Sequence, residues 1–131
     1  MKVLPNGIAV IEGDTHISKW VEDSGRIDHD QNMLPLLVPF IRPGSTVIDI
    51  GAFIGDHTVF YAGIAGHVHA FEPNVEAFQC LKHNVPSNVT CYLTGASDTH
   101  HTAQLAVDPN SGASHLKDAT DGVKCFPLDD L

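Results

Sequence analysis

The chain has 131 residues, about the length of one small domain, and its 43% hydrophobic content predicts a folded protein rather than a disordered one. Seven Lys and Arg residues stand against sixteen Asp and Glu residues, which gives a formal net charge of -9. This balance argues against nucleic acid as a partner, because nucleic-acid recognition depends on clustered positive charge. We also expect no membrane association, because no apolar run has the length of a membrane span and no signal peptide is recognisable.

Residues 1–41 predict a small unit made of a hairpin and two helices. The stretch "KVLPNGIAVIEG" places two short apolar runs around Pro5, Asn6 and Gly7, which is the turn chemistry of a β-hairpin. "THISKWVEDSG" then predicts a helix that stops at Gly25. "DHDQNMLPLLVPFI" predicts a second helix with Pro35 in its first turn, where a missing N–H costs little. We expect this unit to cover the domain that follows.

From residue 42 onward the pattern alternates between strand and helix. The predicted order is "TVIDI", "GDHTVFYAGIAG", "HVHAFEP", "NVEAFQCLKHNV" and "NVTCYLTGAS", in which the first strand is apolar on both sides like a buried parallel strand. Such an order predicts an α/β fold with a Rossmann-like, doubly wound and mainly parallel sheet. "TAQLAVD" and "GVKCFPL" predict two further strands in an antiparallel excursion.

A candidate site lies in "VIDIGAFIGDHT", residues 47 to 58, where the first strand of this pattern ends. Ligands of open parallel sheets bind beyond the carboxyl ends of the strands. Gly51 permits a sharp turn, and we expect Gly55 to admit a ligand to the backbone at the start of a helix. Glu72 ends the next strand about 20 residues later, the usual place for an acid that binds a ribose. These features predict a cofactor that contains a nucleoside.

The glycine pattern favours S-adenosylmethionine over NAD. A dinucleotide site needs the spacing GxGxxG, but Ala52 and Phe53 stand where the second glycine would fall. Asp49 suits a cationic ligand and would repel a pyrophosphate.

"TVIDIGAFIGDHTVFYA", "GHVHAFEPNVEAFQCLKHNV", "NVTCYLTGASD", "SGASHL" and "PLDDL" resemble, in this order, the FkbM-type family of S-adenosylmethionine-dependent methyltransferases. The resemblance covers residues 42–131 and implies a class I methyltransferase fold. It also implies methyl transfer to a hydroxyl group of a sugar or another small-molecule acceptor. The three cysteines are odd in number and form no CxxC pair, so we expect reduced thiols and a cytoplasmic location.

The resemblance also implies which residues bind the cofactor. The methionine side would be held by Asp49, Gly51, Ala52, Phe53, Gly55, His57 and Thr58, the ribose by Glu72, Pro73 and Asn74, and the adenine by Ala96, Ser97 and Asp98. Phe53 departs from the pattern, because an asparagine is common at this place in the family. No residue is predicted as the catalytic base.

Family members continue beyond "LDDL" into a fourth strand that pairs with the first one, so the resemblance implies that the 42–131 domain is incomplete at its C-terminus. We expect little activity from this chain alone. The free edge of residues 46–50 would then be covered by the N-terminal hairpin, by residues 122–128, or by a second copy in a homodimer.

Other interpretations of these residues stay open. The alternative to cofactor binding is helix capping for Asp49. For His57 it is the role of an ordinary polar residue at the start of a helix. The nine His and three Cys residues show no recognised zinc spacing, so we expect reduced thiols and no metal site. The alternative functions are a non-catalytic fragment that binds S-adenosylmethionine or a nucleoside, and half of an NAD-linked oxidoreductase.

Overall fold

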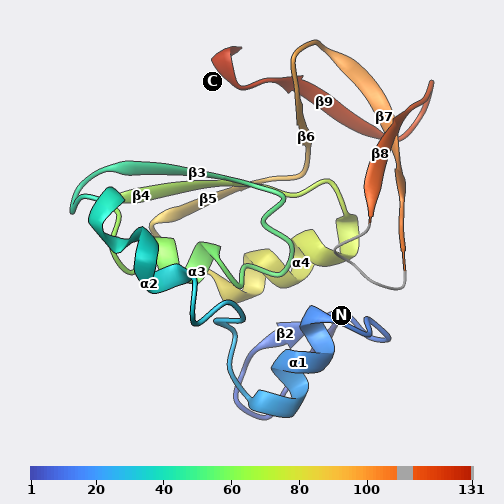
Figure 1. Ribbon diagram of the computed structural model, residues 1–131. Helices are drawn as coiled ribbons and strands as arrows, with labels where there is room; N and C mark the ends of the chain where they lie inside the picture. The colour runs from blue at the N-terminus through green and yellow to red at the C-terminus, as the bar shows by residue number, and fades with distance from the viewer. Residues whose placement is uncertain (109–113, 131) are drawn as a thin grey trace.

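The computed structural model describes residues 1–108 and 114–130, which form three small sheets and several short helices (Figure 1). The first half contains β1 (Lys2–Val3), β2 (Ala9–Val10), α1 (Ile17–Ser24), α2 (Leu34–Leu37), the 3-10 helix η1 (Val38–Phe40), β3 (Thr46–Ile50) and α3 (Thr58–Ala62). The second half contains β4 (His67–Phe71), α4 (Val75–Asn84), β5 (Val89–Tyr92), β6 (Gly95–Ser97), β7 (His101–Ala106), β8 (His115–Asp118), β9 (Val123–Pro127) and the 3-10 helix η3 (Leu128–Asp130).

The central sheet has three parallel strands in the order β3-β4-β5. Thr46 lies opposite His67 and Ile50 opposite Phe71, while Val68 lies opposite Val89. The β-branched residues of β3 favour this extended backbone. The three strands and the two helices between them follow the predicted chain order, so the prediction of alternating strands and helices is confirmed for this part of the chain.

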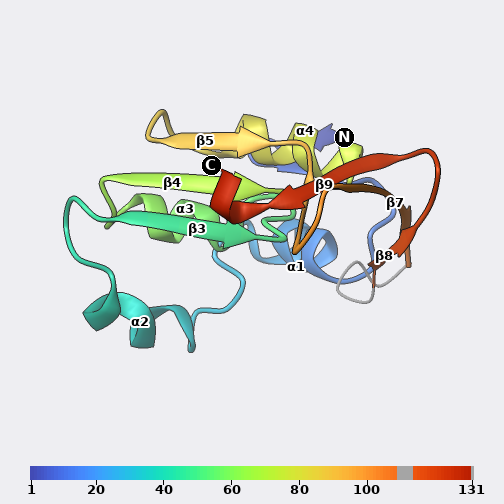
Figure 2. The same ribbon diagram turned by 90° about the horizontal axis from the view of Figure 1, so that it is seen from above.

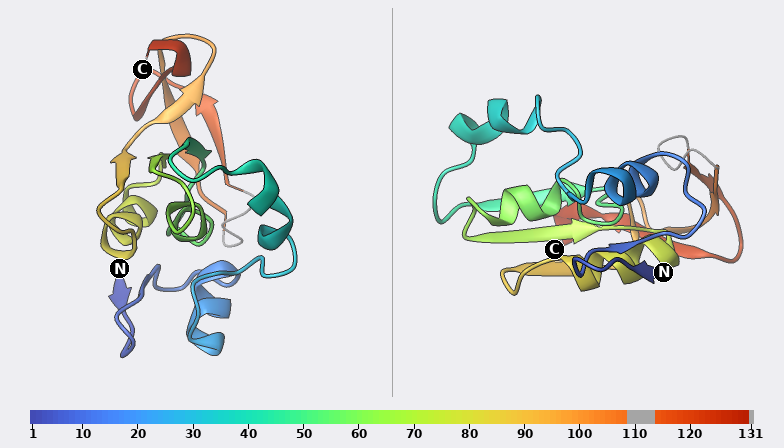
Figure 3. Two further views of the ribbon diagram at one scale, coloured as in Figure 1. Left: turned by 90° about the vertical axis from the view of Figure 1, so that its left-hand side faces the viewer. Right: turned by 90° about the horizontal axis from the view of Figure 1, so that it is seen from below.

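The predicted doubly wound sheet is wrong, because α3 and α4 lie on the same face of the sheet (Figures 1 and 3). Val68 and Ala70 are fully buried in β4, in two clusters with residues of the loops and helices beside them. On the opposite face, Ile48 is 50% exposed and Ile50 is 57% exposed. The strand "TVIDI" is therefore an edge strand with one uncovered face, although its apolar composition predicted burial on both sides.

The link between β5 and β6 explains why the winding stops. Only Leu93 and Thr94 separate these two strands, whereas a crossover to a further parallel strand needs about ten or more residues. The chain instead leaves the central sheet and enters a second one. The single strand predicted over residues 88–97 is therefore two strands that belong to different sheets.

The second sheet is mixed and has the order β6-β9-β7-β8. β6 pairs with β9 in parallel, and β7 pairs with both β9 and β8 in antiparallel fashion. The predicted antiparallel strands at residues 102–108 and 122–128 are confirmed as β7 and β9. β8 was not predicted as a strand, and the "SGASHL" motif around its start falls partly outside the described residues, as does Leu131.

The N-terminal unit contains the predicted hairpin, in which Lys2 lies opposite Val10, and the predicted helix α1. Gly25 ends α1 in a left-handed conformation with φ of 70°, as the sequence indicated. The second predicted helix is shorter than expected, because α2 and η1 together span only residues 34–40. No helix in the described ranges 1–108 and 114–130 combines the length and the apolar character that a membrane span requires.

Candidate ligand-binding site

A cavity of about 650 Å³ opens where β3 and β4 end, between the central sheet, the N-terminal unit and the second sheet. Five residues predicted to bind a cofactor line it, namely Gly51, Phe53, Glu72, Pro73 and Asn74. The N-terminal unit and the second sheet supply the opposite walls, with Ile11, Glu12, Gly13, Asp14, Ile17, Leu105, Val107, Asp108 and Ser114. The cavity therefore lies at the end of the strands where ligands of parallel sheets bind.

Glu72 follows β4 directly and is only 5% exposed. Its two carboxylate oxygens accept the backbone N–H groups of Phe53 at 2.8 Å and of Asn74 at 2.7 Å. Burial raises the pKa of Glu72 above its ordinary value, and the two backbone N–H groups oppose this rise. The carboxylate thus connects the loop after β3 to the start of α4.

Phe53 has a left-handed backbone with φ of 49°, a conformation that costs a residue with a side chain roughly 1–2 kcal/mol. Its N–H group is held by Glu72, so the hydrogen bond that anchors the carboxylate also anchors the strained loop. Asparagine tolerates this conformation better than phenylalanine does, because its short polar side chain hydrogen-bonds locally.

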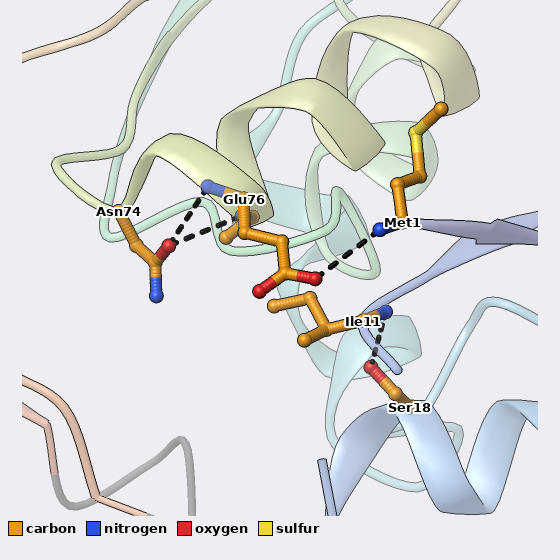
Figure 4. A network of polar contacts seen from close by, with 6 residues as sticks. Met1, Ile11, Ser18, Asn74 and Glu76 are labelled. Atoms are coloured by element: carbon orange, nitrogen blue, oxygen red, sulfur yellow. Dashed lines mark hydrogen bonds and ion pairs between the residues drawn. The ribbon is translucent and has the colours of Figure 1, made fainter. Parts of the chain in front are cut away.

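The rim of the cavity at α4 is fixed by polar contacts (Figure 4). Asn74 caps α4 by accepting the N–H groups of Glu76 at 2.9 Å and Ala77 at 3.3 Å. Glu76, another lining residue, pairs with the amino terminus of Met1 at 3.2 Å. The first residue of the chain is thereby placed beside the start of α4.

Asn84, the last residue of α4, links the N-terminal unit to the α/β core. Its side-chain oxygen accepts the N–H group of Ala9 at 2.7 Å, and its amide nitrogen donates to the carbonyl groups of Ala9 and Ile54, both at 2.8 Å. Asp14, on the wall of the cavity, accepts the N–H group of Ser18 at 2.7 Å and so holds the start of α1. Sequence reasoning missed Asn84 and Asp14, because no local pattern links them to the glycine loop.

The wall of the cavity is acidic. Its charged residues are Glu12, Asp14, Glu72, Glu76 and Asp108, and within the described chain no Lys, Arg or His belongs to its lining. The remaining surface is largely apolar, with Phe53 on one side and Leu105 on the other. Such a wall disfavours phosphate groups and suits a ligand that is neutral or cationic and partly apolar.

Three of the predicted cofactor residues lie together but outside this cavity. Asp49 accepts the hydroxyl of Thr58 at 2.6 Å, and His57 contacts Asp30 at 2.8 Å between Nε2 and Oδ2. Burial raises the pKa values of Asp49 and of the neighbouring Asp56, and the charge of His57 opposes both rises. This polar cluster joins the loop before α2 to the start of α3. Asp49 bonds to the hydroxyl of Thr58 rather than to a backbone N–H group of α3, so this bond is not a helix cap.

Ala52 and Gly55 have packing roles. Ala52 is 2% exposed and lies in a core cluster with Ala70 and Leu81. A Cβ atom on Gly55 would lie 3.1 Å from Leu81 and 3.3 Å from Val85. The segment that approaches Gly55 closely is therefore helix α4, and not the ligand that the sequence led us to expect there.

Ala96, Ser97 and Asp98 lie in and after β6, away from the cavity lining. Ala96 and Ser97 pair with Phe126 and Pro127 of β9. Pro73 and Asn74 do lie beside Glu72 as predicted, so the residues of the predicted ribose side meet in the cavity. Those of the predicted adenine side do not.

No cluster of three or more His, Cys, Asp or Glu residues within the described ranges has an arrangement that would hold a metal ion. Two of the histidines instead bond to β5, His67 to Thr90 and His69 to Tyr92, each at 2.9 Å.

No family model matches the chain, and no curated protein matches it. Among solved structures, precorrin 8W decarboxylase from Methanobacterium thermoautotrophicum is similar, with 23% sequence identity and a TM-score of 0.42. The match covers 47% of this chain, and the chain spans only 37% of that protein. A likeness of this extent carries no argument for the function of the chain.

The predicted membership of the FkbM-type family is wrong, and so is the predicted methyltransferase function. No methyltransferase family model matches the chain, and helices cover the central sheet on one face only (Figure 1).

Proposed function

We propose that the cavity at the ends of β3 and β4 binds a ribonucleoside that carries no phosphate, with S-adenosylmethionine as the first ligand to test. The observation that supports this most strongly is the buried carboxylate of Glu72, which lines the cavity at the tip of β4. An acidic residue in this position binds ribose hydroxyl groups in nucleoside sites of parallel α/β sheets.

The hydrogen-bonding capacity of Glu72 fits this role. A carboxylate offers about four acceptor positions, and the N–H groups of Phe53 and Asn74 each take one. The remaining positions suffice for the two adjacent hydroxyl groups of a ribose. Because Phe53 and Asn74 fix the carboxylate before a ligand arrives, little side-chain entropy is lost on binding.

The other walls favour the rest of such a ligand. The apolar side chains of Ile11, Ile17 and Leu105 offer contacts for a base. The carboxylates of Glu12 and Asp14 favour a cationic group, such as the sulfonium or the ammonium of S-adenosylmethionine, and oppose a phosphate. NAD, with its pyrophosphate, is therefore the disfavoured alternative.

Calorimetric titration with matched ligands tests the proposal. Adenosine and S-adenosylmethionine should bind, AMP should bind more weakly than adenosine, and NAD should bind least. Glu72→Gln should weaken adenosine binding by about 1.5–3 kcal/mol, the range for a hydrogen bond to a charged group. The same variant should lose most of the parent's preference for adenosine over 2′-deoxyadenosine, because that preference requires the carboxylate.

Ser97→Ala is the matched control, since Ser97 was predicted to contact the ligand but does not line the cavity. It should bind like the parent chain. Circular dichroism establishes that each variant is folded before it is titrated. Preference for AMP or NAD over adenosine, or an unchanged adenosine affinity in folded Glu72→Gln, would refute the proposal.

A further inference from the structure

The outer edge of β3 carries backbone groups that face away from the sheet. Ser45 accepts the N–H group of His67 at 3.2 Å, and Gly51 donates to the carbonyl group of Phe71 at 2.9 Å. Because the backbone direction alternates along a parallel strand, the N–H and C=O groups of Thr46, Ile48 and Ile50 point to the opposite side. In the described residues β3 pairs only with β4, so these groups have no strand partner.

Neither of the intramolecular partners expected from the sequence covers this edge. The hairpin strands β1 and β2 pair with each other, and β9 pairs with β6 and β7. Open edges of this kind are sites of strand addition, which proteins usually block or use.

Exposed apolar side chains accompany the open edge. Ile48 and Ile50 project from the uncovered face of β3, at 50% and 57% exposure. Beyond the edge, on the side away from β4, lies α2 with η1 (Figure 2). This segment and the residue before it leave four large side chains exposed: Met33, Leu36, Val38 and Phe40. Phe40, at 83%, is the most exposed of them.

The same segment is almost free of charge. Between residues 31 and 50 the charged residues are Arg42 and Asp49, which cancel, although the whole chain carries a net charge of -9. Two copies of so acidic a chain repel each other over most of their surface. The stretch around β3 therefore carries no net charge that would repel a second copy.

The other edge of the sheet, β5, is also free of Lys, Arg, Asp and Glu, but its strand has no exposed side chains. All four residues of β5, Val89–Tyr92, are half-buried, and β5 is shorter than β3. Edge pairing is therefore expected at β3.

We propose that two copies of the chain associate by antiparallel pairing of β3 with β3 about a two-fold axis at Ile48. In this register Ile48 faces Ile48 of the second copy, and Thr46 faces Ile50. Each outward residue then exchanges both of its backbone groups with its partner. The two sheets become one continuous sheet, and the exposed isoleucines of both copies lie side by side on one face. A two-fold arrangement closes the edge, so the assembly stops at a dimer.

Charge substitution at the axis gives a test specific to this register. The parent chain should sediment as a dimer at micromolar concentration. Ile48→Lys places two lysines opposite each other, and Ile48→Glu two glutamates, so each variant alone should associate at least about tenfold more weakly. An equimolar mixture of the two variants should recover the dimer, because lysine then faces glutamate across the axis.

Val75→Lys is the matched control, because Val75 lies on α4 and is 54% exposed, close to the value for Ile48. It should dimerise like the parent chain. A monomeric parent chain, an undiminished dimer in folded Ile48→Lys, or a mixture no more dimeric than the separate variants would overturn the proposal.

Discussion

The substitution Gly55→Ala examines the junction between the glycine loop and α4. Gly55 has φ of 94°, a backbone that costs an L-residue about 1–2 kcal/mol. The new methyl group would also lie 3.1 Å from Leu81 and 3.3 Å from Val85. Leu81 is fully buried and has little room to move, so overpacking adds about 1–3 kcal/mol. We expect Gly55→Ala to lower the free energy of unfolding by about 2–5 kcal/mol in total.

Gly51→Ala is the comparison that isolates the packing contribution. Gly51 has φ of 78°, but a Cβ atom added there would have nothing within 4 Å, so only the backbone cost of about 1–2 kcal/mol applies. Urea unfolding followed by the fluorescence of Trp20, the single tryptophan, measures both variants. Equal losses within about 0.5 kcal/mol would refute the reasoning, because the close approach of α4 would then not be what requires glycine at position 55.

Three further outcomes are expected. Burial raises the pKa values of Asp56 and Glu72, so the folded chain keeps protons that the unfolded chain has lost, and these carboxyl groups lower stability as the pH rises from about 4 towards neutrality. Urea unfolding at several pH values should therefore show that Asp56→Asn becomes more stable relative to the parent as the pH rises. A difference in stability that does not change with pH would contradict this. Burial also raises the pKa of Cys80 to about 11, so mass spectrometry after iodoacetamide treatment at pH 8 should find Cys80 unmodified until the chain is unfolded. Finally, Leu34→Ala should cost about 2–5 kcal/mol of stability and Leu36→Ala less than about 0.5, because Leu34 is 1% exposed and Leu36 is 69% exposed.

The sequence correctly indicated those lining residues of the cavity whose positions depend only on the end of one strand and the loop that follows it. Glu72, Pro73 and Asn74 follow β4 without interruption, so their place at the tip of the sheet follows from the end of the strand. Gly51 ends β3 in the same way. Ala96, Ser97 and Asp98 were placed by analogy with a complete fold, but the turn after β5 takes Ala96 and Ser97 into another sheet, and Asp98 follows that strand.

The opposite wall of the cavity was beyond sequence reasoning. Glu12, Asp14, Leu105 and Asp108 come from segments that are distant in the chain and share no periodic pattern with the glycine loop. They meet Glu72 because the hydrogen bonds of Asn84 and an apolar core cluster attach the N-terminal unit to α4, and because the second sheet folds back beside it. A long-range contact of this kind is set by side-chain hydrogen bonds and packing, and neither leaves a local signature.

The sequence by itself determined the alternation of strands and helices from residue 46 to residue 92 and the turn at Gly25. It also determined the acidic tip of β4, because these features depend on local periodicity, capping and backbone preference. Only the tertiary structure decided that both helices cover one face and that the strand "TVIDI" lies at an edge. An apolar, β-branched strand has the same local pattern at the centre of a sheet and at its edge. The two-residue link between β5 and β6 made the difference, because it is too short for a crossover and leaves the second face of the sheet without a covering helix.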